Sequence, residues 1–132
     1  EASMSDSILL STKKTLGLAE DYTAFDQDII MHINSVFSVL HQLGIGPLEG
    51  FEIIDDTDTW EDFASDVRLN SIRSYVYLRV RLLFDPPTTS FLLNALQEQI
   101  KELEWRINVY REEQLEDALP LSYVIDGGSP QD

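Results

Sequence analysis

Apolar residues in the stretch from residue 68 to residue 87 recur every three or four positions. This spacing places them on one face of a helix, and a second apolar stripe beside the first predicts burial on two sides. The β-branched residues here would also suit a strand, but a run of about 16 residues is too long for one. Pro86 and Pro87 must end the helix because proline has no amide hydrogen. We therefore predict a central helix that the other helices surround. Its two stripes are Leu69, Ile72, Val76, Val80 and Leu83, and Tyr75, Leu78 and Leu82.

Two other long segments show the same helical spacing. Residues 24–43 form a predicted amphipathic helix, with Asp21 or Thr23 as its cap and Gly44 as its end. Its apolar stripe is Phe25, Ile29, Ile33, Val36, Phe37, Leu40 and Leu43. After the two prolines, Thr88 or Thr89 is expected to cap a last helix that runs to about Glu113. Its apolar positions form the seam of a helix packed lengthwise on another. These positions are Leu93, Leu96, Ile100, Leu103, Ile107 and Tyr110.

Shorter elements fill the rest of the chain. Ser11 is the expected cap of a short helix from Thr12 to Leu16, in which Lys13 and Lys14 are expected to be solvated. Glycines and a proline between residues 44 and 50 predict an irregular loop, and eight acidic residues follow between 49 and 66. Asp58 or Thr59 is expected to start a helix through Trp60 and Phe63.

The predicted fold class is all-α, a compact bundle of about four to five helices with an irregular acidic loop and an extended C-terminal tail. Residues 1–6 are expected to be a flexible N-terminus with a tag remnant, and residues 7–113 a single helical domain. Residues 114–132 are expected to be an acidic, flexible tail with an apolar docking segment. A chain of 132 residues is long enough for one domain with a real core.

Charge and composition narrow the function classes. The net charge is −15, which weighs against binding of free nucleic acid or an anionic membrane. Two kinds of partner remain: a protein with a basic surface, or DNA that passes the protein and must be kept from adhering to it. The chain has no cysteine, hence no disulfide or thiolate chemistry. No apolar run reaches membrane-spanning length and no signal-peptide pattern opens the sequence, so we expect a cytoplasmic protein.

The residues for catalysis are missing from the sequence pattern. No nucleotide-binding, nucleophile-elbow or HExxH motif occurs, and both histidines, His32 and His41, lie on one predicted helix. The cluster Asp55, Asp56 and Asp58 lacks the glycine and terminal glutamate of an EF-hand. We therefore predict no enzyme, no catalytic or metal site and no cofactor.

Three surfaces are candidates for contacts with other molecules. The arginines of the central helix have no acid among them, so they either lie over the core with their tips paired elsewhere or face an acidic neighbouring subunit. They are Arg68, Arg73, Arg79 and Arg81. Trp105 falls off its helix seam and either covers the core edge or lies in a subunit interface. The apolar tail segment is either a docking peptide or packs back on its own domain; its apolar residues are Leu119, Leu121, Tyr123, Val124 and Ile125.

The chain resembles the head–tail connector, or adaptor, proteins of long-tailed bacteriophages and prophages. The resemblance rests on SILLSTKKTLGLAEDYTAFDQDIIMHINSVFSVLHQLGIGP, on TWEDF, and on SYVYLRVRLLFDPP followed by FLLNALQEQIKELEWRINV. It covers roughly residues 7–109, and it is a likeness of overall sequence and element order without a catalytic motif.

This resemblance implies a helical virion protein of the phage neck, assembled in the bacterial host cytoplasm. About a dozen copies would form a ring under the portal, extend the DNA conduit and receive the next connector, stopper or tail protein. DNA would pass without specific binding, no membrane would be involved, and whether the isolated chain is a monomer stays open. Such adaptors use a flexible end to grip the portal, for which residues 119–125 are the matching segment.

The charge pattern suggests how copies would meet in such a ring. Subunits of a ring meet head to tail, so two different surfaces must be complementary. The arginine face and the acidic loop have opposite signs and form a candidate subunit interface, to which the loop contributes Asp55, Asp56 and Asp58. Reversal of Arg73 and Arg79 to glutamate is expected to disrupt it. The alternative function is an acidic inhibitor that mimics DNA and occupies a basic nucleic-acid-binding protein.

Overall fold

The computed structural model describes residues 7–64 and 69–118, with side chains described up to residue 112 except that of Leu69. Within these ranges the chain forms five helices and no strand, and Ser7 and Thr59 form an isolated β-bridge. The predicted all-α class is therefore confirmed. The helices are α1 (Ile8–Thr15), α2 (Asp26–Gln42), α3 (Trp60–Phe63), α4 (Leu69–Phe84) and α5 (Ser90–Ala118).

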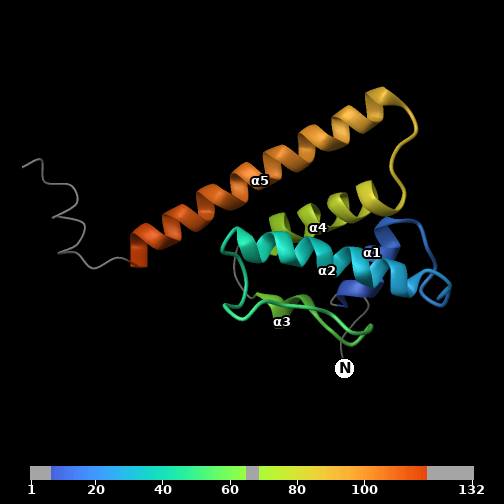
Figure 1. Cartoon of the computed structure of the whole chain (residues 1–132), viewed down its shortest axis with the longest axis horizontal. Coiled ribbons are helices and arrows are strands. Elements are labelled where there is room, and N and C mark those ends of the chain that lie inside the picture. Colours follow the sequence, from blue (N-terminus) through green and yellow to red (C-terminus); the bar gives the residue numbers. More distant parts are fainter. Residues whose placement is uncertain (1–6, 65–68, 119–132) are drawn as a thin grey trace, which may run out of the picture.

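Helix α4 is the centre of the bundle, as its apolar stripes predicted. It packs against α2 on one side and α5 on another, and α1 contacts both α2 and α4. Figure 1 shows α5 running beside α4 at an angle to it, with its C-terminal turns extending past the ends of α2 and α4. The irregular segment between α2 and α3 lies on the side of α2 that faces away from α5. The molecule therefore has a helical side formed by α5 and a loop side formed by residues 44–59.

The buried core follows the predicted stripes with three exceptions among the described residues, two of which lie at one end of the molecule. Most stripe positions of α2, α4 and α5 are buried or half-buried. Leu83, Tyr110 and Phe25 are instead 47%, 41% and 40% exposed. Phe25 packs edge-on against Phe84 with ring centroids 5.4 Å apart, and Tyr22 packs against Phe25. Aromatic rings therefore close this end of the bundle at the surface.

Two helix starts differ from prediction and two agree with it. Helix α1 begins at Ile8, because the Ser7 hydroxyl accepts a hydrogen bond from the Leu10 amide at 3.2 Å. The cap predicted at Ser11 is thus wrong. Helix α2 begins after Phe25, without a side-chain cap. Thr59 starts α3 with a capping box. Thr89 accepts from the Leu92 amide at the start of α5, which continues past the predicted end to Ala118.

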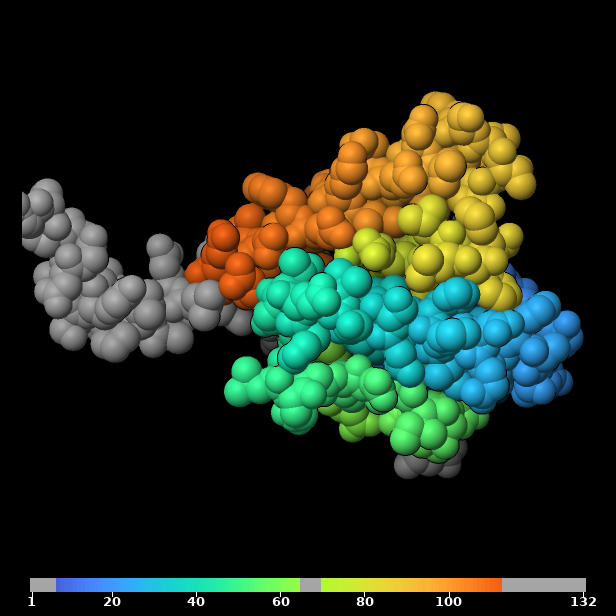
Figure 2. Space-filling view, in the orientation of Figure 1, coloured from blue at the N-terminus to red at the C-terminus, as the bar shows by residue number. Residues whose placement is uncertain are grey.

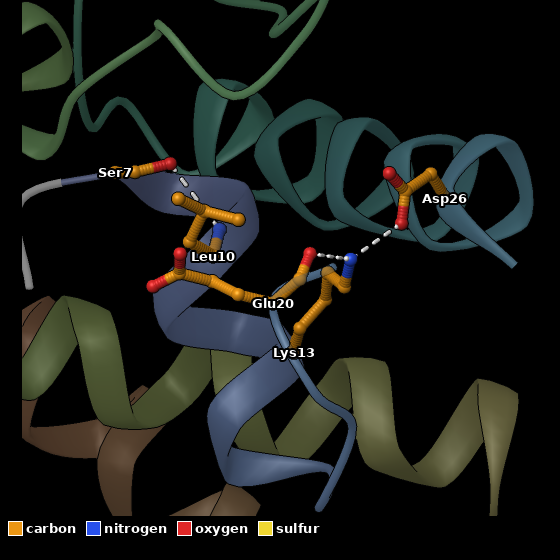
Figure 3. Close-up of polar contacts among 5 residues, drawn as sticks. All are labelled: Ser7, Leu10, Lys13, Glu20 and Asp26. Carbon is orange, nitrogen blue, oxygen red and sulfur yellow. Dashed lines mark hydrogen bonds and ion pairs between the residues drawn. The ribbon is translucent and has the colours of Figure 1, made fainter. Parts of the chain in front are cut away.

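Lys13 is buried, contrary to the prediction that it is solvated. Its side chain is 1% exposed, and it lies one helical turn after the buried Leu9 on the same face of α1. The ammonium donates to the Glu20 carbonyl at 2.9 Å and lies 2.9 Å from Asp26 Oδ1 (Figure 3). The contact with Asp26 is an ion pair without hydrogen-bond geometry at that oxygen. Lys13 thereby ties α1 to the chain leading into α2 and to the first turn of α2.

The loop between α2 and α3 is irregular but fixed to the core. Asn34 acts as a backbone substitute: its amide group accepts from the Ile53 N–H at 2.7 Å and donates to the Ile53 carbonyl at 3.1 Å. Gly46 has φ +95°, and a Cβ there would lie 2.5 Å from the Phe63 ring, so glycine is required on both counts. The buried side chains Ile45 and Ile53 complete the attachment.

Candidate assembly surfaces

The arginines of α4 occupy three different environments. The Arg73 guanidinium lies over the Trp60 ring, 5.5 Å from its centroid. Arg79 lies 3.4 Å from Glu104 of α5. Arg81 is exposed and forms no ion pair with any residue that the structure describes. Arg68 lies outside the described residues. Since Arg73 and Arg79 contact their own chain, reversing their charges would disturb the fold as well as an interface. A charge reversal at exposed Arg81 tests the interface without breaking a contact within the chain.

A polar contact under the arginine face joins α4 to α5. Tyr75 is fully buried, and its hydroxyl donates to Glu104 Oε2 at 2.7 Å. Arg79 reaches the same carboxylate and lies 5.7 Å from the Tyr75 ring centroid. Burial raises the pKa of Tyr75 above its usual range, and the hydrogen bond to Glu104 adds to the rise. The three residues fix the angle and register at which α5 crosses α4.

The raised pKa of Tyr75 predicts a loss of stability in alkaline solution. The folded protein holds this proton to higher pH than the unfolded chain, whose tyrosines ionise near pH 10. The stabilisation is thus complete below about pH 10 and falls as pH rises further. Urea unfolding at about pH 9 and about pH 11 should show a larger drop in the free energy of unfolding for the natural chain than for Tyr75→Phe. Equal drops would contradict this.

The acidic loop uses its carboxylates to hold its own shape. Asp58 Oδ2 accepts from the amides of Ile54 at 2.6 Å and Asp55 at 3.2 Å. Asp55 Oδ1 accepts from the hydroxyl and amide of Thr57, and these hydrogen bonds lower the pKa of Asp55. The Asp56 carbonyl accepts from Ser7 Oγ at 2.8 Å, while its side chain is exposed. The turn therefore presents negative charge in a fixed conformation. Among the described residues no group of acids and histidines is arranged to hold a metal ion.

Trp105 lies at the edge of a groove between α4 and α5. Its side chain is 66% exposed, so it does not bury against the core of its own chain. It lines a hollow of about 350 Å³ with Ser71, Val109 and Tyr110. A second hollow of about 460 Å³ continues along the same two helices toward α1 and shares Arg106 with the first. No sequence pattern pointed to this groove, because it depends on how far apart α4 and α5 pack.

The remaining candidate residues lie outside the part of the chain that the structure describes. These are the tail residues Leu119, Leu121, Tyr123, Val124 and Ile125. None of the described helices is long and apolar enough to cross a membrane. Figure 2 shows that the surface of α5 which faces away from α4 is covered by no other described part of the chain in this view. The described surfaces thus comprise the acidic loop, the uncovered face of α5 and the groove between α4 and α5.

Comparison with known proteins places the chain in a family. No curated protein and no solved structure matches the chain. The sequence does match the family described as phage connector protein, over residues 8–114. The match includes all five helices up to the last turns of α5. The chain therefore belongs to the phage connector protein family.

Proposed function

We propose that this chain is a head–tail adaptor whose copies form a ring below the portal of a filled phage capsid. The ring extends the DNA conduit and receives the next connector, stopper or tail protein. The family match over residues 8–114 carries the proposal. The fold is consistent with it, because the long helix α5 leaves one face uncovered for contacts with other subunits (Figure 2).

The charge of the chain is consistent with a conduit wall. Acids outnumber basic residues 24 to 9, and an excess of one sign repels a polyanion over roughly a Debye length, about 8–10 Å. DNA then slides past without adhering. A partner that binds this acidic chain stably is expected to present a basic surface to it. We propose that the portal supplies it and that residues 119–125 are the segment that grips the portal.

Mixing the purified chain with portal rings tests this function. We expect a discrete increase in particle mass, by mass photometry, that corresponds to one added ring of the chain. Duplex DNA in excess should neither bind the chain nor displace it from the portal. Aspartate at Leu121, Tyr123 and Val124 of the full chain should weaken portal binding, whereas aspartate at exposed Ser38 should not.

Two outcomes would contradict the adaptor role. If the chain and the portal form no complex even at concentrations well above those used in the mixture, the portal is not its partner. Displacement of the chain from a basic nucleic-acid-binding protein by duplex DNA would instead favour the DNA-mimic inhibitor. Duplex DNA titrated into the portal complex and into a complex with a basic nucleic-acid-binding protein therefore separates the two functions.

A further inference from the structure

The groove between α4 and α5 has an apolar floor and small residues on one wall. Tyr77 and Leu78 of α4 and Leu103 of α5 form the floor. Ser74, one turn before Leu78, leaves the wall low enough for a side chain to enter. The volume of about 460 Å³ exceeds that of one aliphatic side chain. The groove is therefore able to receive an apolar side chain from another molecule.

One basic residue lines this groove, and two others lie next to its lining residues along the chain. Arg106 lines it and pairs at 2.6 Å with Glu102, which also lines it, so these two charges offset each other. Lys14 precedes Thr15, which lines the groove from α1, and Arg81 lies one helical turn beyond Leu78. Lys14 and Arg81 are exposed and form no ion pair with a described residue. The unbalanced charge beside the groove is that of Lys14 and Arg81, which favours a ligand with an apolar tip and acidic residues next to it.

The acidic loop of the same chain has this chemistry. Ile54 is 79% exposed although it is aliphatic, and Glu52, Asp55 and Asp56 surround it in the sequence. Its amide is held by Asp58 at 2.6 Å, so the tip needs little ordering before it docks. The loop lies on the side of the molecule away from α5 in Figure 1. Its position excludes docking into the groove of its own chain without unfolding.

We propose that Ile54 of one copy enters the α4–α5 groove of the next copy in the ring, with the loop acids facing Lys14 and Arg81. This proposal rests on the proposed adaptor function and names the contact between its subunits. Two different surfaces on opposite sides of one chain give a head-to-tail interface, which closes into a ring when the rotation between copies allows. Opposite charges at the rim select this register over others.

Disulfide trapping tests the contact directly, because the natural chain contains no cysteine. The full chain with Ile54→Cys and Ser74→Cys, both at exposed positions, is oxidised alone and on portal rings. We expect a ladder of covalent oligomers on a non-reducing gel, forming at least about tenfold faster than with the control Met31→Cys and Ser74→Cys. Met31 is 61% exposed on α2. Equal rates for the two pairs, with and without portal, would overturn the proposal.

A charge exchange provides an independent test. Glu52→Lys with Asp56→Lys changes the loop, and Lys14→Glu with Arg81→Glu changes the groove. Each variant alone should associate about tenfold more weakly. Their mixture should recover, because every contact of an alternating ring again joins opposite charges. Asp28→Lys and Lys101→Glu, on other faces, should change nothing. Failure of the mixture to recover would contradict the pairing.

Other occupants of the groove give different patterns. If the pair Tyr123→Cys and Ser74→Cys forms the faster ladder, the tail segment occupies the groove and the assignment to Ile54 is wrong. A collar on the portal without the Ile54 ladder would refute this contact and leave the adaptor function standing. The Ile54 ladder without a collar on the portal would support this contact and refute the adaptor function.

Discussion

Replacing Trp60 with alanine is expected to lower the free energy of unfolding by about 3–5 kcal/mol. The indole is fully buried, and its N–H donates to Ser11 Oγ at 3.0 Å. Its ring packs edge-on with Phe37 of α2 and Tyr77 of α4, at 6.2 and 5.8 Å between centroids. One side chain thus joins α3 to α1, α2 and α4, and its loss leaves a cavity among four elements.

The second tryptophan is the matched control for this measurement. Trp105→Ala removes the same group from a position that is 66% exposed, so the expected loss is within about 0.5 kcal/mol. Urea unfolding followed by far-ultraviolet circular dichroism gives both values. Similar losses for the two variants would show that Trp60 is not the junction that the packing indicates.

Replacing Lys13 with alanine is expected to cost about 3 kcal/mol, at the low end of the range for breaking a buried ion pair. The variant leaves the Asp26 carboxylate and the Glu20 carbonyl without the ammonium that contacts both at 2.9 Å. The Asp26 side chain keeps 22% of its exposure, so water partly replaces the lost partner.

Two further variants separate charge from packing at this position. Lys13→Met keeps an aliphatic side chain in the buried site and removes the charge, so its loss should be smaller than that of Lys13→Ala. Lys14→Ala, at the exposed neighbouring position, should lie within about 0.5 kcal/mol of the natural chain. Equal losses for Lys13 and Lys14 would mean that the ion pair does not tie α1 to α2.

The long helices were predictable because their signals are local. Apolar spacing located α2, α4 and α5, and Gly44 and Pro86 marked two of the ends. The start of α1 was not predictable in the same way, since Ser7 and Ser11 are equally good caps in sequence. The structure selects Ser7 through a hydrogen bond to the distant Asp56 carbonyl.

The candidate surfaces depended even more on distant contacts. Lys13 is buried because Glu20 and Asp26 approach it from the next segments of the chain. The arginines of α4 looked alike in sequence, but Glu104 binds Arg79 and leaves Arg81 exposed. The groove beside Leu78 exists only once α5 has crossed α4 at a particular angle. Local patterns contain none of this information.

Electron microscopy of the chain mixed with purified portal rings tests the central claim most directly. The adaptor account predicts a continuous collar of helical density on one end of the portal, coaxial with its channel and built from repeated copies of the five-helix fold. Bare portal particles, or single copies bound at scattered positions without a collar, would contradict it.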